Sequence, residues 1–297
     1  GYEVCRCLKQ NEKLREIPVI FLSALGETLD KVRAFDVGGV DYITKPFQIE
    51  EVRARVETHL RLRRLQLQLE AHNRQLQERV DEQVREISES QMATIVALAR
   101  LAESRDEGTG KHIERVQIYC RLLATELREH PGRPGRVNET FIENIFRASP
   151  LHDIGKVAIR DSILLKPGPL TAAEFDEMKM HTTLGAQTLE EVRKAYPKNG
   201  FVRMGIEIAR FHHERWDGTG YPHGLAGTAI PLSARIMAVA DSYDAARSRR
   251  FYKPPMPHEE CCAAIYRRSG TYLDPVVVEA FRAVEASFSQ VAESLGE

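Results

Sequence analysis

Five of the chain's ten histidines, and two of its aspartates, stand in segments flanked by aliphatic residues between positions 112 and 241. Neutral imidazole and carboxylate are side chains that hold Zn, Fe, Mn, Ni and Co, and a carboxylate can bridge two cations. One cation with three or four ligands does not need seven side chains, whereas two cations do. The sequence therefore predicts a two-metal site, with Asp153 suited to bridging. Its ligands are His112, His152, Asp153, His181, His212, His213 and Asp241.

The adjacent pairs His152-Asp153 and His212-His213 are the strongest part of this pattern. A single histidine in such a segment is more often a satisfied core or surface residue than a ligand. Paired polar side chains are harder to explain by packing, because burial without partners costs free energy. We expect His152-Asp153 on a short helix. Lys156 then shares a face with Asp153, three positions earlier, although a lysine at a helix end is ordinarily a surface residue.

The order of these residues resembles the H...HD...D metal site of the HD phosphohydrolase superfamily. The additional histidines, with the segments HHERWDGTGYPHGL and HDIGKVAIRDSILLKPGPLT, resemble the HD-GYP subfamily. Its naming tripeptide stands at Gly220, Tyr221 and Pro222, and the resemblance runs from about Met92 to Phe281. Several long motifs in a fixed order make this match specific, unlike one short pattern.

The resemblance implies a metal-dependent phosphodiesterase that opens cyclic diguanylate, a bacterial second messenger, to linear pGpG, with further cleavage to GMP left open. Two divalent cations would polarise the phosphoryl oxygens and activate water. Their identity stays open among Fe, Mn, Ni, Co and Zn. In the family, the residues matching His112, His152, Asp153 and Asp241 serve one metal. Those matching His181, His212 and His213 serve the other, with Asp153 bridging.

Further residues match the family's substrate contacts. Arg250 and Lys253, in RSRRFYK, resemble its phosphate-binding pair, and Asp106 matches an aspartate placed near the site. With Lys156 they are the expected substrate-binding residues, although a basic run is usually a solvated surface. The GYP loop is a turn signal with a rigid proline. In the family it has been linked to protein partners.

One departure from the family affects the metal count. Trinuclear members carry a glutamate four residues before the first histidine, where this chain has Gly108. Glu107 lies at a different helical angle and substitutes poorly, so we expect two metals. A preference for linear pGpG over the cyclic form stays open. So does a different class of function, a non-catalytic module that binds a cyclic dinucleotide or a partner protein.

The expected architecture is mainly α-helical with three parts. Residues 92–297 alternate helical segments with loops marked by glycine and proline, which predicts an all-α, HD-type metal-dependent phosphohydrolase domain. Residues 61–91 lie within a helix without proline or glycine from 48 to about 105. Its spaced aliphatic residues predict a coiled-coil linker and a homodimer. They are Leu62, Leu65, Leu69, Leu76, Val80, Val84 and Ile87.

Residues 1–60 alternate helix and strand signals, which indicates an α/β layer with a parallel sheet. The segments GYEVCRCLK, IPVIFLSA and GGVDYITKPF resemble the second half of a response-regulator receiver domain, a flavodoxin-like fold. In that family, residues matching Ser23 and Lys45 contact the phosphoryl group. The phosphoacceptor aspartate would precede Gly1, so we expect a partial receiver domain. An intact one would take its phosphoryl group from a histidine kinase.

Composition disfavours several classes of function. The net charge of −1 disfavours a general binder of nucleic-acid polymers, which would be more basic. The five cysteines form no CxxC pair, which favours reduced thiols and a cytoplasmic protein. No apolar run approaches the length of a membrane span, and we expect no membrane partner.

Overall fold

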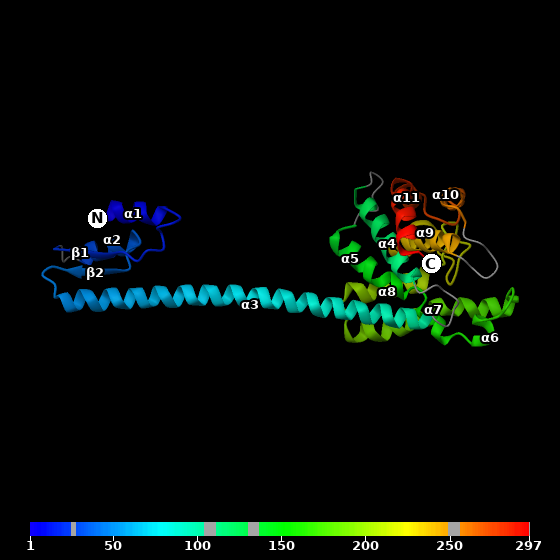
Figure 1. Cartoon of the computed structure of the whole chain (residues 1–297), viewed down its shortest axis with the longest axis horizontal. Helices are drawn as coiled ribbons and strands as arrows, with labels where there is room; N and C mark the ends of the chain where they lie inside the picture. Colours follow the sequence, from blue (N-terminus) through cyan, green and yellow to red (C-terminus); the bar gives the residue numbers. More distant parts are fainter. Residues whose placement is uncertain (25–27, 104–110, 130–136, 249–255, 297) are drawn as a thin grey trace. The chain divides into compact units, whose positions relative to one another are not determined.

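The computed structural model describes residues 1–24, 28–103, 111–129, 137–248 and 256–296. The chain forms two compact units, Gly1–Ile87 and Ser88–Glu297. Helices dominate the described residues, and the mainly α-helical fold class is confirmed (Figure 1). None of the helices in these ranges combines the length and the apolar character that crossing a membrane requires.

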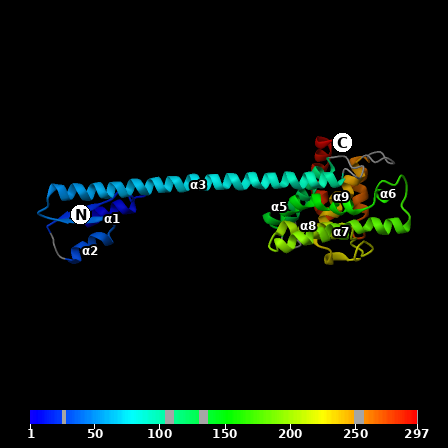
Figure 2. The ribbon, with the colours of Figure 1, turned by 90° about the horizontal axis from the view of Figure 1, so that it is seen from below.

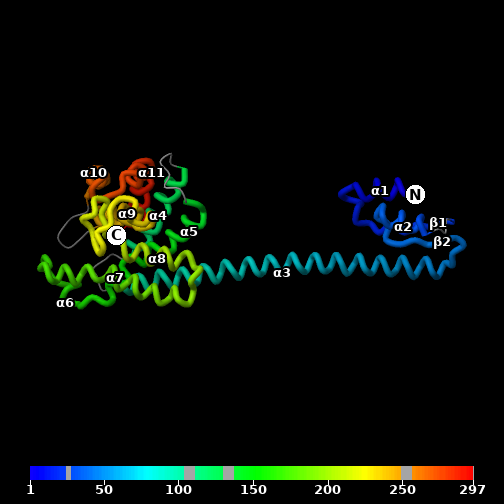
Figure 3. The backbone as a smooth tube through the Cα atoms, turned by 180° about the vertical axis from the view of Figure 1, so that it is seen from behind, coloured from blue at the N-terminus to red at the C-terminus, as the bar shows by residue number. Residues whose placement is uncertain are grey.

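The first unit contains a small parallel sheet. Strand β1 (Ile20–Ser23) pairs in parallel with β2 (Asp41–Thr44), and Phe21 lies opposite Tyr42. Helices α1 (Tyr2–Gln10) and α2 (Thr28–Asp36) precede the two strands in turn (Figure 3). The order helix, strand, helix, strand is the α/β alternation that the sequence predicts.

Helix α3 (Ile49–Glu103) is continuous, as the absence of proline and glycine predicts. The seven aliphatic side chains of the predicted coiled coil are each between 44% and 61% exposed on the single chain. The last turns of α3 are less exposed, since Ala99, Ala102 and Glu103 are buried.

The second unit is all-α among its described residues. Its α-helices are α4 (His112–Glu129), α5 (Glu139–Ala148), α6 (Asp161–Leu164), α7 (Ala172–Ala195), α8 (Gly200–Phe211), α9 (Leu232–Arg247), α10 (His258–Arg267) and α11 (Pro275–Leu295). Three short 3-10 helices join them, which are η1 (Ser149–Leu151), η2 (Ile154–Ala158) and η3 (Gly227–Ala229). Outside helices, the described residues of this unit make isolated bridges but no strand.

Side-chain caps determine where several of these helices begin. Asn138 and Asn199 accept hydrogen bonds from the first turns of α5 and α8. Thr171 and Glu174 form a capping box at the start of α7, each bonding the other's backbone N–H. Such caps satisfy N–H groups that the helix leaves unpaired, so they set the register of the residues that follow.

The main core lies around α4, which packs against α5, α9 and α11 (Figure 1). Its aromatic centre joins Tyr119 and Phe288, whose rings stack with centroids 4.2 Å apart, to Tyr243 and Phe281. All four side chains are fully buried. Helices α7 and α8 lie alongside each other (Figure 2), and η2 packs against α7. The helices packed around α4 and the pair α7 and α8 carry different residues of the candidate site.

Candidate metal centre

The predicted ligands come from five parts of the second unit. His112 begins α4, His181 lies within α7, and Asp241 lies within α9. His212 ends α8 as its C-terminal cap, and His213 follows it. His152 and Asp153 lie between η1 and η2. The expected short helix is a pair of 3-10 helices with His152 and Asp153 at their junction; 3-10 turns are tighter than α-helical ones, with hydrogen bonds between residues three apart.

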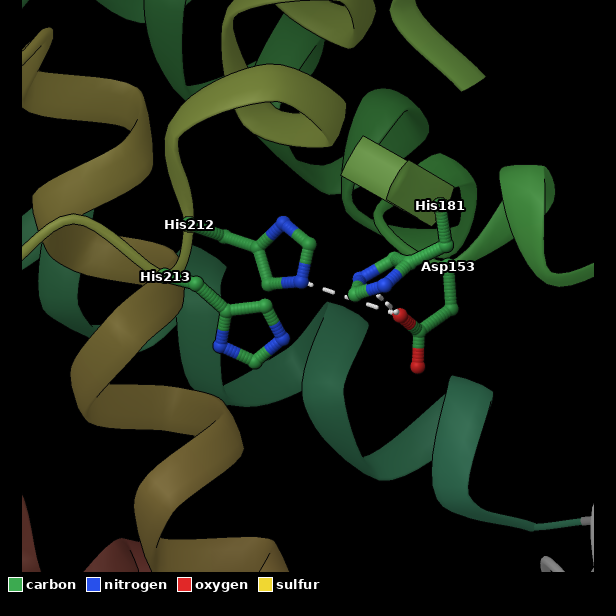
Figure 4. A group of neighbouring side chains, drawn as sticks. All are labelled: Asp153, His181, His212 and His213. Atoms are coloured by element: carbon green, nitrogen blue, oxygen red, sulfur yellow. Dashed lines mark ion pairs between the residues drawn. The ribbon is translucent and has the colours of Figure 1, made fainter. Parts of the chain in front are cut away.

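Two groups of ligand atoms form from these residues. Within each, the ligand atoms all lie within 4.8 Å of one another. Group 1 is His112, His152 and Asp241, and group 2 is Asp153, His181, His212 and His213. In Figure 4 the group 2 side chains converge from α7, the end of α8 and the segment before η2. The structure thus brings all seven predicted ligands together, in two neighbouring sets.

Hydrogen bonds orient four of the five histidines. Nδ1 of His152, His181 and His212 lies 2.7 to 3.0 Å from a backbone carbonyl oxygen, of Ser149, Met178 and Ile208 respectively. Nδ1 of His112 lies 2.7 Å from Asp244 Oδ2. Because a carbonyl or carboxylate oxygen accepts, each Nδ1 must donate its proton. In the neutral ring, Nε2 then carries the lone pair that a metal ion needs.

Asp244 is a residue of this centre that the sequence analysis missed. It is fully buried and bonds both His112 and Arg115, whose Nε lies 2.6 Å from Asp244 Oδ1. These partners hold its pKa at about 2 although burial alone would raise it. Asp244 follows Asp241 by three positions, and that spacing on one helix face is the signal that could have identified it.

Asp153 connects the two groups. Its Oδ1 lies 3.3 Å from His181 Nε2 and 3.7 Å from His212 Nε2, both in group 2 (Figure 4). Its Oδ2 lies 3.3 Å from His152 Nε2, in group 1, and 2.8 Å from Lys156 Nζ. The Lys156 contact agrees with the expectation that these side chains share a face. Burial would raise the pKa of Asp153, but Lys156 and His152 hold it well below its usual value.

The donor atoms fit bound cations. Asp153 Oδ1, His181 Nε2 and His212 Nε2 are buried and make no hydrogen bond. Buried polar atoms without partners are rare, because each loses its hydration without replacement. Three of them converge at one place, and all three belong to residue types that bind transition metals. A cation at group 2 would satisfy all of them together.

The metal-free histidines differ in pKa between the groups. Burial lowers the pKa of His181 to about 4 and that of His213 well below the usual value. Burial acts in the same direction on His152 and His112, but neighbouring carboxylates outweigh it. Asp153 raises the pKa of His152 to about 9, and Asp244 raises that of His112.

Backbone contacts hold the two HD residues against α7. A Cβ atom on Gly155 would lie 1.9 Å from the carbonyl oxygen of His181 and 2.6 Å from the backbone N of Gly185. No side chain fits at that distance, so glycine at 155 permits the approach of η2 to α7. The approach places Asp153 beside His181.

The GYP loop borders group 2. The ring of Tyr221 lies 4.8 Å from that of His213 and 6.2 Å from that of Phe175. The buried Glu214 carboxylate accepts hydrogen bonds from the backbone N–H groups of His223 and Leu225. A Cβ on Gly220 would lie 2.4 Å from the backbone N of Arg215. These contacts are consistent with loop shaping as one role of the motif.

Glu103, at the end of α3, is a second residue that the sequence analysis missed. Its Oε1 lies 3.5 Å from His112 Nε2, and its side chain is 10% exposed. Three predicted substrate residues, Asp106, Arg250 and Lys253, lie outside the described residues, as do Glu107 and Gly108.

Comparison with known proteins agrees with this geometry. The family model described as "HD domain" matches residues 96–277, and the model described as "Response regulator receiver domain" matches residues 1–57. The resemblance to both families is therefore confirmed.

Three relatives illustrate the similarity. A "Probable cyclic di-GMP phosphodiesterase" of Vibrio cholerae is 44% identical over 100% of this chain and 68% of its own length. The "Cyclic di-GMP phosphodiesterase response regulator RpfG" of Xanthomonas campestris pv. campestris is 37% identical over 98% of this chain and 74% of its own. A "3'3'-cGAMP-specific phosphodiesterase 2" of Vibrio cholerae is 39% identical over 65% of this chain and 35% of its own.

Proposed function

The chain belongs to the HD domain family, and on this premise we propose that it is a metal-dependent phosphodiesterase that hydrolyses cyclic di-GMP to linear pGpG. Water adds across one P–O bond of the ring, which leaves a 5′-phosphate and a 3′-hydroxyl. The observation that carries the proposal is the convergence at group 2, beside group 1, of three buried ligand atoms that make no hydrogen bond. The names of two relatives that align with nearly all of this chain support cyclic di-GMP as the substrate.

We propose two divalent transition-metal ions per chain, one at each group. Group 1 would hold one through His112, His152 and Asp241, and group 2 the other through its three histidines. Asp153 would bridge them, which its two oxygens support by facing different groups. Fe, Mn, Ni, Co and Zn all suit imidazole and carboxylate donors. Bound there, the metals would supply Lewis acidity for the phosphoryl group and an activated water.

The chain's own residues would orient and neutralise the reacting groups. The Nδ1 hydrogen bonds keep each Nε2 aimed at the site. Lys156 supplies a positive charge beside Asp153, and its side chain is 19% exposed, which leaves it within reach of a phosphate oxygen. We propose Asp153 and Lys156 as catalytic residues, and Lys156, Arg250, Lys253 and Asp106 as substrate-binding residues.

The test combines metal analysis with product chromatography. The purified chain, reconstituted with Mn, Fe or Ni, is incubated separately with cyclic di-GMP, linear pGpG and 3'3'-cGAMP. Asp153→Ala controls for contaminating nucleases, and Asp176→Ala, at an exposed aspartate of α7, is the matched control. We expect about two metals per chain and turnover of cyclic di-GMP that Asp153→Ala alone abolishes.

The other outcomes identify the alternatives. Faster cleavage of pGpG or of 3'3'-cGAMP would replace the proposed substrate with that nucleotide. Binding of cyclic di-GMP without cleavage under every metal would contradict the enzyme and identify a non-catalytic signalling module.

We further propose that α3 forms a homodimeric coiled coil, through which a receiver domain served by a histidine kinase regulates hydrolysis in the cytoplasm. The seven aliphatic side chains of α3 are half exposed on one chain, and a second copy would bury them. Leu69→Glu, within this row, should shift the protein to monomer in light scattering. Leu67→Glu, at a similarly exposed leucine outside the row, should leave the mass unchanged.

A further inference from the structure

The Glu103 carboxylate lies against group 1 with one oxygen unsatisfied. Oε1 is 3.5 Å from His112 Nε2, which in turn is 3.5 Å from His152 Nε2. Oε2 is buried and makes no hydrogen bond. The side chain is nine-tenths buried, which removes it from bulk water.

We propose that Glu103 is an additional carboxylate ligand of the metal ion at group 1. The inference rests on the proposed metal-dependent function and adds to it a residue from the last turn of α3. Group 1 and the bridging Asp153 would supply four side-chain ligands, and a transition-metal ion commonly takes four to six. Glu103 is placed to supply one of the remaining positions.

The hydrogen-bond pattern supports a cation between these atoms. His112 donates its Nδ1 proton to Asp244, and His152 donates its own to the Ser149 carbonyl. In the neutral rings both Nε2 atoms are acceptors, and so is the Glu103 carboxylate. His112 Nε2 then faces an acceptor on each side, Glu103 Oε1 and His152 Nε2, with no hydrogen between them. A divalent cation would convert this repulsion into coordination.

The free energy of burial points the same way. An ionised carboxylate removed from water is costly unless it is paired with a cation or with hydrogen-bond donors. A metal ion at group 1 would offset the cost by keeping the carboxylate charged.

One competing role is purely structural. If His112 is doubly protonated, its imidazolium joins Asp244 on one side to Glu103 on the other, without any metal. This ion-paired arrangement would stabilise the metal-free fold and leave metal affinity unchanged when Glu103 is replaced. The two roles therefore differ in whether metal affinity or metal-free stability depends on Glu103.

The experiment measures Mn²⁺ binding by the full chain after chelator treatment, by calorimetry and by metal analysis after dialysis. Glu103→Gln keeps the shape but removes the charge. Glu89→Gln, at an exposed glutamate of the same helix, is the matched control. We expect two Mn²⁺ per wild-type and control chain. In Glu103→Gln, one equivalent should weaken by at least about 10-fold, and the other should stay unchanged.

Tight binding of both equivalents by Glu103→Gln would overturn the inference. So would a lower metal-free Tm with unaltered Mn²⁺ affinity, because that result assigns the structural role. Should Glu103→Gln fail to fold, Glu103→Asp retains the charge and withdraws it by one methylene. Selective weakening of one equivalent in that variant supports the ligand role, and two tight equivalents contradict it.

These outcomes separate the inference from the proposed function. Wild-type protein that binds two Mn²⁺ but cleaves no nucleotide would contradict the phosphodiesterase and leave Glu103 as a ligand. Wild-type protein that binds no Mn²⁺ would overturn both the Glu103 ligand and the proposed metal-dependent function.

Discussion

The two ligand groups of the centre are supported in different ways. In group 1, His112 is oriented by the Asp244 carboxylate, which Arg115 neutralises from behind. In group 2, His181 and His212 are oriented by backbone carbonyl oxygens, each within a helical turn of the histidine itself. The His112 ligand of group 1 therefore depends on a distant side chain, although His152 is oriented by the nearby Ser149 carbonyl, whereas His181 and His212 of group 2 depend on the position of α7 and α8 as whole helices.

The difference appears in the charge state of the metal-free histidines. Carboxylates raise the pKa of His152 to about 9, and burial lowers that of His181 to about 4. The means of disrupting each group differ accordingly. Group 1 should be sensitive to charge-removing substitutions. Group 2 should be sensitive to substitutions that move backbone.

The largest effect is expected where the groups meet. Asp153→Asn keeps the size of the side chain but removes the charge that faces both groups. Phosphodiesterase activity should fall by more than about 100-fold, the upper end of the loss when a partner behind a metal ligand is removed. Metal content should fall at the same time. Full activity with Asn at 153 would contradict a bridging role.

A substitution behind group 1 should weaken that group alone. Asp244→Asn removes the charge that pairs with Arg115 and holds the His112 proton at Nδ1. Metal affinity at group 1 should fall by about 10- to 100-fold, with group 2 unchanged, as Mn²⁺ titration would measure.

The same variant tests stability. Arg115 is 4% exposed, and a buried charge left without its partner costs about 3 to 5 kcal/mol. The Tm of the metal-free protein should therefore fall. Equal weakening of both groups would remove the distinction between them.

A substitution that displaces the backbone should weaken group 2 more than group 1. Gly155→Ala places a methyl group where only 1.9 Å separates it from the His181 carbonyl oxygen, so η2 and α7 must move apart. We expect a loss of stability of about 1 to 3 kcal/mol in urea unfolding. Metal affinity should fall at group 2 more than at group 1. An unchanged group 2 would show that α7 packing does not position His181.

The smallest effect is expected at the start of α7. Lys166 and the backbone of Thr171 lower the pKa of Glu174 to about 2, against an ordinary value of 4.5. A lowered folded pKa stabilises the protein above pH 4.5, and the contribution is lost as pH falls toward 2. Glu174→Gln should therefore lower Tm slightly at pH 7. The difference from wild type should disappear between pH 4.5 and 2, and a difference independent of pH would assign it to another cause.

Much of this architecture was predictable from local sequence. The freedom of residues 48–105 from proline and glycine predicts α3, and the apolar runs before Ser23 and Thr44 predict β1 and β2. The 3-10 turns around His152-Asp153 were not predicted, because their register follows from packing against α7 at Gly155. Neither composition nor periodicity predicts such a contact between separate segments of the chain.

The sequence by itself determined which residue types could form a metal centre, since ligand chemistry belongs to the side chain and the motif order is local. It identified the seven candidate ligands that the structure assembles. Only the tertiary structure decided their division into two groups, the Nδ1 partners that aim each Nε2, and the places of Asp244 and Glu103. His112 and Asp244 are 132 positions apart in the chain, and only the packing of α4 against α9 brings them within 2.7 Å.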